Sequence, residues 1–176
     1  MSRIGKKSIK IPSGVEVKVD GLTVMVKGIK GELEKKLPDV LDIKQENDSL
    51  TVGLKGGIIK YRDNSRLWGL GRALIATMVE GVSTGFEKVL EFSGVGFKAQ
   101  VKGDSIELNL GYSNPVVIQA PAGVTFQTEK NTIKVLGADK EKVGRAAALI
   151  RDARPPEPYK GTGIKYKDEV IIRKAG

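Results

Sequence analysis

The sequence predicts an α+β fold of two related domains, each a mainly antiparallel sheet packed against one helix. Three observations lead to this prediction. Short runs of alternating apolar and polar residues, typical of half-buried strands, recur through both halves of the chain. Each half also contains one longer segment with apolar residues at helical spacing. In addition, two segments share a frame of prolines, glycines and valines, which indicates an internal duplication.

The shared frame relates residues 11–28, IPSGVEVKVDGLTVMVKG, to residues 120–137, APAGVTFQTEKNTIKVLG, with a constant offset of 109 in the numbering (120 less 11). A second similarity, GRALI at 71–75 and GRAAA at 144–148, has an offset of 73 in the numbering (144 less 71). We interpret the difference between the two offsets, 36 (109 less 73), as an insertion that enlarges the first copy. Chance similarity between two ordinary hairpins is the alternative.

The first domain is predicted to span residues 1–81. Its alternating runs predict strands at 15–19, 22–27, 32–37, 41–45 and 50–54. A helix follows, with Asn64 or Ser65 as its N-cap and its end near Glu80. Its apolar stripe consists of Leu67, Leu70, Leu74 and Met78, widened by Trp68, Ile75 and Val79. Because this stripe can cover the sheet, Trp68 is expected in the core and not on a base-stacking surface.

The second domain is predicted to span residues 82–176, after a linker at Gly81–Gly85. Its predicted strands lie at 87–93, 97–102, 105–110, 116–119, 124–128 and 132–136. A helix is predicted from the N-cap Asp139 to about Ala153, because a carboxylate suits the positive end of a helix. The residues expected on its buried face are Val143, Ala146, Ala147 and Ile150.

Composition limits the possible functions. The 176-residue chain has a formal net charge of +9 at pH 7 and contains neither cysteine nor histidine. The charge favours a polyanionic partner such as nucleic acid. The missing residue types remove disulfides, thiol nucleophiles, the usual zinc ligands and the commonest general acid–base group. No apolar run approaches the roughly 18–20 residues of a membrane helix, and the N-terminus lacks the apolar region of a signal peptide, so a soluble intracellular protein is expected. We expect that it is not an enzyme and has no catalytic residue, metal, cofactor, membrane partner or small-molecule substrate.

One glycine pattern superficially suggests a cofactor. Residues 94–99, GVGFKA, match the dinucleotide-binding pattern G-x-G-x-x-A, which requires a helix immediately afterwards. Here the alternating run QVKGDSIELNL follows, so a strand is predicted in place of that helix. The glycines then indicate a strand or bulge that another backbone approaches closely, from protein or from nucleic acid. Lys98 keeps the nucleic-acid alternative open and is a candidate contact.

A basic segment at residues 154–166, RPPEPYKGTGIKY, directly follows the second predicted helix. Its prolines restrict the backbone, while its glycines permit conformations that other residues avoid. Arginine and lysine bind phosphate groups well, and the candidate cations are Arg151, Arg154, Lys160, Lys165 and Lys167. We interpret the segment as a polyanion-binding loop and expect the second domain to be the main binding unit.

The neutral residues of this segment suggest further contacts. Gly161 and Gly163 are expected to let a phosphate approach the backbone and to present amides to it. Tyr159 and Tyr166 can stack on exposed bases or sugars, or they can pack against the sheet; the sequence leaves both possibilities open. Residues 155–158 also match the P-x-x-P pattern of adaptor-domain ligands, but such ligands normally sit in disordered tails.

PPEPYKGTGIKY closely resembles the C-terminal signature of the family of ribosomal large-subunit protein six. Other similar motifs are spread over the whole chain: SRIGKKSI at 2–9, IPSGV at 11–15, MVEGVSTGF at 78–86, GVGFKA at 94–99, LGYSNP at 110–115 and GADKEKVG at 137–144. The sequence departs from the family pattern at Thr162, where many relatives have lysine. Because the motifs span the chain, the resemblance concerns both predicted domains.

The resemblance implies two similar α+β domains without catalytic activity. It implies a structural constituent of the large ribosomal subunit that binds 23S-type rRNA, mainly through its C-terminal domain. The implied location is the stalk base and translation-factor-binding centre, among neighbouring ribosomal proteins, with a role in subunit assembly and translation. Carried over by motif, the implied RNA-facing residues are Arg154, Tyr159, Lys160, Gly161, Gly163, Lys165, Tyr166 and Lys98.

Overall fold

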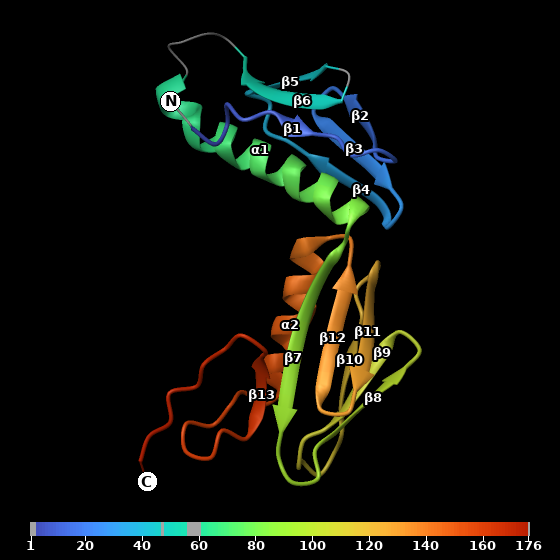
Figure 1. The fold of residues 1–176 in the computed structure, drawn as a ribbon, viewed down its shortest axis with the longest axis vertical. Helices are drawn as coiled ribbons and strands as arrows, with labels where there is room; N and C mark the ends of the chain where they lie inside the picture. Colours follow the sequence, from blue (N-terminus) through green and yellow to red (C-terminus); the bar gives the residue numbers. More distant parts are fainter. Residues whose placement is uncertain (1–2, 47, 56–60, 176) are drawn as a thin grey trace. The chain divides into compact units, whose positions relative to one another are not determined.

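The computed structural model describes residues 3–46, 48–55 and 61–175. The chain divides into two compact units, Met1–Gly85 and Phe86–Gly176 (Figure 1). Each unit has its own cluster of buried apolar side chains, and each contains antiparallel sheets and one helix. The predicted fold class is therefore confirmed.

The first unit contains two three-stranded sheets, in the orders β1-β6-β5 and β2-β3-β4. The strands are β1 Ile9–Lys10, β2 Glu16–Asp20, β3 Thr23–Gly28, β4 Gly31–Lys36, β5 Leu41–Glu46 and β6 Ser49–Leu54. Successive side chains of a strand point to opposite faces, so alternate residues enter the core. On β3 these are Val24 and Val26, and on β6 they are Leu50 and Val52. The predicted strands thus form, together with β1, which was not predicted.

Helix α1, Tyr61–Ser83, packs mainly on β3 and β6. Trp68 and Ile75, two turns apart, are both buried on its inner face, so the predicted core position of Trp68 is confirmed. The Trp68 Nε1 group donates a hydrogen bond to the carbonyl oxygen of Val52 at 2.5 Å. Leu70 follows Trp68 by two residues, about 200° around the helix. It is 51% exposed, so its predicted place in the apolar stripe is wrong.

Both ends of α1 extend beyond the prediction. The helix begins at Tyr61, before Asn64 and Ser65, the residues predicted to cap it. Its last turn includes residues 81–83, which were assigned to the linker. Val82 in this turn is completely buried, and tertiary packing of that kind stabilises a helix end more than local preference does. The connection to the second unit is therefore shorter than predicted.

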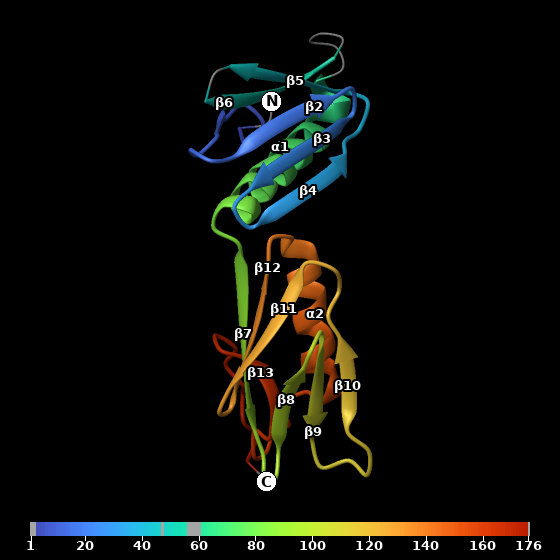
Figure 2. The same cartoon turned by 90° about the vertical axis from the view of Figure 1, so that its right-hand side faces the viewer.

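The second unit contains a four-stranded sheet, β11-β12-β7-β13, and a three-stranded sheet, β10-β9-β8 (Figure 2). The strands are β7 Phe86–Ser93, β8 Lys98–Lys102, β9 Ser105–Asn109, β10 Val116–Gln119, β11 Val124–Glu129, β12 Thr132–Gly137 and β13 Gly163–Tyr166. Strand β8 begins within GVGFKA and is followed by β9, so strands form here as predicted, and not the helix that a dinucleotide site requires. Strand β13 was not predicted.

Helix α2, Lys140–Ala153, packs against β7, β12 and β13. Asp139 is its N-cap, and the side-chain carboxylate accepts a hydrogen bond from the amide of Glu141 at 2.9 Å. The buried residues of the helix are the predicted ones, Val143, Ala146, Ala147 and Ile150. Their spacing places all four on the face that covers the sheet.

The two units repeat one arrangement of strands. The sheet β1-β6-β5 corresponds to β7-β12-β11, and β2-β3-β4 corresponds to β8-β9-β10. In the first hairpin Asp20 pairs with Thr23, and in its counterpart Lys102 pairs with Ser105. Both partners are displaced by 82 in the numbering (102 less 20 and 105 less 23). The duplication predicted from the sequence is therefore present, but in a different register.

The predicted offset of 109 in the numbering is wrong because it equates β2–β3 with β11–β12, which occupy different sheets of the repeat. The two segments look alike because the same turn precedes each of them. Val15 donates its amide to the carbonyl oxygen of Pro12 at 3.2 Å, and Val124 donates to that of Pro121 at 3.0 Å. The inferred insertion is also wrong, since β4–β6 of the first unit correspond to β10–β12 of the second.

Candidate nucleic-acid interface

The basic segment at residues 154–166 is folded onto the second unit. Its last part is strand β13, which pairs with β7 so that Gly163 lies opposite Ser93 and Tyr166 opposite Leu90 (Figure 1). Ile164 between them is completely buried in the core of the unit. In the first unit α1 leads directly to β7, so this segment has no counterpart there.

Backbone hydrogen bonds close residues 154–164 into a compact turn. The amide of Ile164 donates to the carbonyl oxygen of Arg154 at 2.8 Å, and that of Glu157 donates to Thr162 at 2.9 Å. The Glu157 carboxylate also accepts from the Thr162 hydroxyl at 3.0 Å and from the Lys160 amide at 3.4 Å. Thr162, the departure from the family pattern, thus helps to hold the turn.

The two glycines of the turn have protein partners. Gly161 has φ +74, a left-handed conformation, and its amide donates to the carbonyl oxygen of Glu157 at 3.0 Å. A Cβ atom added to Gly163 would lie 2.6 Å from the carbonyl oxygen of Pro155 and 2.7 Å from Cα of Pro156. Gly163 was expected to let a phosphate approach the backbone, and in the structure the protein's own prolines occupy the space beside it. The Gly161 amide is likewise already engaged.

Arg154 connects three loops at one end of the second unit. Its Nη1 group donates to the carbonyl oxygen of Leu110, and its guanidinium lies 5.2 Å from the Phe97 ring centre and 5.0 Å from that of Tyr112. The Tyr112 hydroxyl donates in turn to the carbonyl oxygen of Ala153 at 3.2 Å. Cation–π contacts of this kind fix the guanidinium between the two rings. Arg154 therefore holds the GVGFKA loop beside the basic turn.

Arg151 forms a bidentate ion pair with Glu169. Its Nε and Nη2 groups donate to the two carboxylate oxygens at 2.9 Å and 2.6 Å. The hydrogen bond from Arg151 lowers the pKa of Glu169, and the same bond raises the pKa of Arg151. The Tyr166 ring lies against this pair, 6.0 Å from the guanidinium, and burial raises the pKa of its hydroxyl. Of the two possibilities for Tyr166, the structure shows packing against the sheet.

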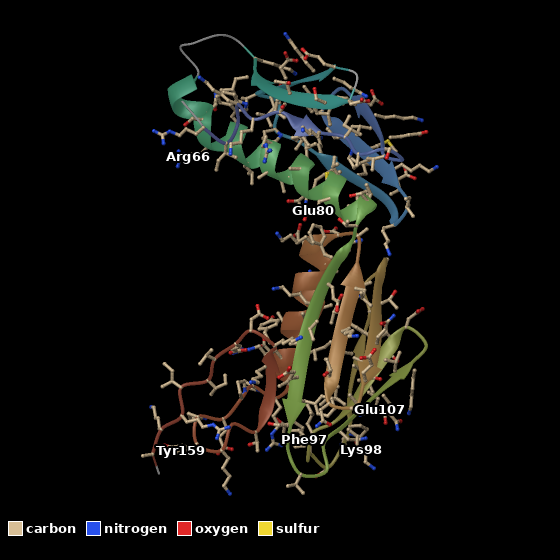
Figure 3. All side chains as sticks on the ribbon, in the orientation of Figure 1. Arg66, Glu80, Phe97, Lys98, Glu107 and Tyr159 are labelled. Carbon is tan, nitrogen blue, oxygen red and sulfur yellow. The ribbon has the colours of Figure 1, made fainter. Side chains whose placement is uncertain are left out.

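The remaining candidate residues are accessible to solvent. Lys98, Lys160 and Lys167 are exposed, and Lys165 is partly exposed. Within the described ranges, no carboxylate lies at ion-pairing distance from these four ammonium groups. Tyr159 is 56% exposed, so its ring remains available for stacking. Figure 3 shows Tyr159 and Lys98 at the same end of the second unit.

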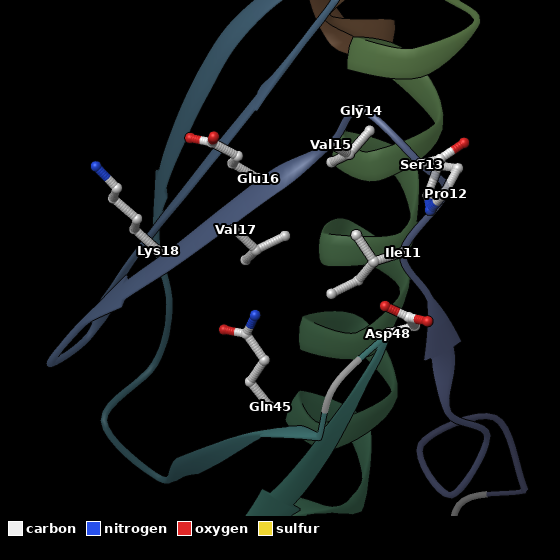
Figure 4. A pocket seen from close by; sticks show the side chains of 10 residues that line it. All are labelled: Ile11, Pro12, Ser13, Gly14, Val15, Glu16, Val17, Lys18, Gln45 and Asp48. Atoms are coloured by element: carbon white, nitrogen blue, oxygen red, sulfur yellow. The ribbon is translucent and has the colours of Figure 1, made fainter.

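Other kinds of site have less support. Among the residues that the structure describes, no group of three or more Asp or Glu side chains could hold a metal ion. No described helix combines the length and apolar character needed to span a lipid bilayer. Figure 4 shows a hollow in the first unit between β2 and the β5–β6 turn, and no predicted RNA-binding residue lines it. The candidate interface is thus an open basic surface.

Comparison with known proteins identifies the family. The sequence model of ribosomal protein L6 matches residues 11–85 and 93–167. The chain belongs to the ribosomal protein L6 family. The starts of the two matches differ by 82 in the numbering (93 less 11), which is the offset that the paired strands define. The L6 family consists of structural ribosomal proteins and not of enzymes.

Individual relatives are similar over nearly their whole length. The chain is 54% identical over 177 residues to the large ribosomal subunit protein uL6 of a Synechococcus species, covering 100% of this chain and 97% of the relative. It is 51% identical over 177 residues to uL6 of Trichormus variabilis, covering 100% and 96%. The same identity relates it to uL6 of Prochlorococcus marinus, with 100% and 97% covered. The family resemblance seen in the sequence motifs is therefore confirmed.

The sequence identified the cations in and near the basic segment at residues 154–166, but not the groups that hold the arginines and the turn in place. It missed Glu157 and Glu169, whose carboxylates organise the turn and the end of β13. It also missed the aromatic contacts of Phe97 and Tyr112 with Arg154. The two acidic residues do leave a signal, because a carboxylate within a strongly basic segment indicates an internal partner.

Proposed function

We propose that this chain is a structural constituent of the large ribosomal subunit that binds 23S-type rRNA mainly through its second unit. The observation that carries the proposal is the basic segment that follows α2, which has no counterpart in the first unit and which, with Lys98, presents four surface lysines without ion-pair partners among the described residues. Membership of the L6 family supports the choice of rRNA over other polyanions. The protein acts in the cytoplasm, within the ribosome, and supports subunit assembly and translation.

The ten candidate residues divide into two groups. Lys98, Lys160, Lys165 and Lys167 supply positive charge to phosphates, and exposed Tyr159 stacks on a base or sugar. The other five shape the surface and are Arg151, Arg154, Gly161, Gly163 and Tyr166, each of which has a contact within the protein. Either arginine can contact phosphate only through those N–H groups that are not already hydrogen-bonded within the protein.

The bound region is proposed to be the stalk base, near the translation-factor-binding centre and among neighbouring ribosomal proteins. A crosslinking map from Tyr159 and Lys160 on large-subunit rRNA tests this location. Crosslinks confined to rRNA distant from the stalk base contradict it without affecting the proposal of rRNA binding.

The assembly state tests the function itself. The protein is expected to remain with large subunits through a high-salt sucrose gradient, because rRNA and packed neighbours hold it in the particle. A free nucleic-acid-binding regulator, the alternative function, is expected at the top of the same gradient. Recovery of the protein only at the top contradicts the ribosomal function.

Individual lysines are tested by the salt dependence of rRNA binding. Each phosphate contact releases counterions, so Lys160→Gln or Lys165→Gln should lower the slope of log affinity against log salt by roughly 0.7–0.9. Lys134→Gln is the matched control, since Lys134 lies in the same unit but pairs with Glu129 at 3.0 Å. Equal slopes for all variants show that Lys160 and Lys165 do not contact phosphate.

A further inference from the structure

Glu169 is an acidic residue among the cations of the proposed rRNA surface. Its carboxylate binds Arg151 through two hydrogen bonds, of 2.9 Å and 2.6 Å, and accepts a third from the amide of Tyr166 at 3.1 Å. The side chains of Glu169 and Arg151 are only 23% and 29% exposed. This carboxylate is therefore built into the protein, unlike the exposed acidic groups elsewhere on its surface.

The three hydrogen bonds join α2 to the end of β13. Arg151 belongs to the last turn of α2, and Tyr166 is the last residue of β13. The amide of Glu169 also donates to the carbonyl oxygen of Tyr166 at 3.0 Å, and that of Lys167 donates to Val89 on β7 at 3.1 Å. Glu169 thus closes the turn that follows β13 and ties it to the helix.

Lys165 and Lys167 lie within this closed arrangement. Alternation along the strand turns Ile164 and Tyr166 toward the core, where both contact the buried cluster. Lys165, the residue between them, therefore points to the outer face, and Lys167 is exposed in the turn directly after the strand. A one-residue shift in the register of this short strand would turn Lys165 away from that face.

Charge alone predicts that Glu169 hinders RNA binding. A carboxylate near phosphate groups repels them, so its removal should strengthen RNA binding if charge alone matters. Its pairing with Arg151 also cancels one cation of the surface. A group that opposes the ligand electrostatically but holds its neighbours by three hydrogen bonds contributes through geometry.

We propose that Glu169 is a positioning residue of the rRNA surface: it fixes Arg151 to the end of β13 so that Lys165 and Lys167 project together toward the RNA. This inference rests on the proposed function. Arg151 accordingly serves as the anchor of Glu169 on α2, and the phosphate charge comes from the lysines. The same reasoning does not extend to Glu157, which bonds only within its own turn.

Glu169→Gln tests the proposal by the sign of its effect. The substitution raises the formal net charge of the chain from +9 to +10, so a purely electrostatic role predicts tighter rRNA binding. A positioning role predicts weaker binding, by roughly two- to tenfold, the range for one lost hydrogen bond. The salt slope should also fall below that of the wild type, toward that of Lys165→Gln, because lysines that no longer project toward the RNA make fewer phosphate contacts. Binding that is unchanged or tighter overturns the proposal.

A charge-reversed pair separates the geometry of the contact from its charge. Glu169→Arg alone breaks the ion pair but raises the formal net charge from +9 to +11, so charge alone predicts tighter binding and the positioning role predicts weaker binding. Arg151→Glu combined with Glu169→Arg restores the ion pair and should recover at least part of the affinity that Glu169→Arg loses. The double variant has the same net charge as the wild type. Affinity that is lower in the double variant than in Glu169→Arg contradicts the positioning role.

A matched destabilised variant excludes a general loss of stability. Asp139→Ala removes the N-cap of α2, far along the helix from Arg151, and should leave rRNA affinity unchanged at a temperature where all variants are folded. Failure of Lys160→Gln and Lys165→Gln to reduce binding contradicts the proposed function. A loss with these lysine variants but none with Glu169→Gln contradicts only the positioning of the lysines by Glu169.

Discussion

Gly161 and Gly163 are needed for different reasons in the turn between α2 and β13, because each position tolerates an added side chain differently. At Gly161 the backbone is left-handed and an added Cβ would meet the end of the flexible Arg173 side chain, 3.2 Å away. At Gly163 the obstacle is the rigid backbone of Pro155 and Pro156. Neighbouring side chains can move, but a proline backbone cannot readily do so. Gly163 is thus the residue on which closure of the turn depends.

Gly163→Ala should destabilise the second unit by about 1–3 kcal/mol, because φ +137 is a strained conformation for alanine and its Cβ would meet the prolines. Thermal unfolding followed by circular dichroism measures the change. Gly144→Ala is the control, since Gly144 lies in α2 and an added Cβ has no neighbour within 4 Å. It should raise stability by about 0.5–1 kcal/mol. Equal effects of the two substitutions contradict the close contact at Gly163.

Glu169 should make the stability of the second unit depend on pH. Its pKa is lowered in the folded protein, chiefly by the hydrogen bond from Arg151. The stabilising effect is therefore present above the unfolded-chain pKa of about 4.3 and is lost as the pH falls through the lowered folded value. Thermal midpoints measured from about pH 5 downward should fall less steeply for Glu169→Gln than for the wild type. Parallel curves for the two proteins contradict this linkage.

Secondary structure elements differ in how well the sequence predicts them. Strands with four or more alternating residues, such as β3 and β12, were predicted to within about two residues, because their buried face is visible in the sequence. Strand β1 has only two residues, too few to show alternation. Strand β13 begins at a glycine within a proline-rich segment, so turn signals conceal it. Its position depends on β7, about 70 residues earlier.

The sequence predicts the positive charges of the candidate interface but not the contacts that its arginines make within the protein. The sequence shows which residues are cationic, and Lys160 and Lys165 do lie at the surface without a paired carboxylate among the described residues. The partner of Arg151 is 18 residues away and that of Arg154 is 44 residues away. Only the folded chain brings such groups together, so local pattern could not distinguish anchored arginines from available lysines.

Helix α2 carries Arg151 at one end and its N-cap at the other. Asp139→Ala should lower the free energy of unfolding of the second unit by about 1 kcal/mol, because the Glu141 amide loses its acceptor and a charge leaves the positive end of the helix. Urea unfolding measures the change. Asp139→Asn is the matched control and should keep most of the stability, since asparagine also caps helices well. Equal losses for both variants contradict the capping role.

The whole molecule combines a duplicated fold with a surface found in one copy. Both units repeat the same two sheets and a helix, and the paired hairpins share one constant displacement in the numbering (102 less 20). Only the second unit continues beyond its helix into the basic turn and β13. The extra strand widens one sheet of that unit by pairing with β7, and it holds Lys165 and the adjoining Lys167 in place. Duplication therefore supplied the scaffold, and the added segment supplies the proposed rRNA contacts.

The separate cores of the two units should allow each to be destabilised alone. Ile75 and Ile150 are completely buried in different clusters, so replacing either by alanine should cost its own unit about 2–5 kcal/mol. Trp68 is the single tryptophan and lies in the first unit, so its fluorescence reports unfolding there. Ile75→Ala should lower the midpoint of the fluorescence transition. Ile150→Ala should leave the fluorescence midpoint unchanged. It should lower only the midpoint for unfolding of the second unit, which circular dichroism detects and tryptophan fluorescence does not. A fluorescence midpoint that falls equally in both variants shows that the two units unfold as one.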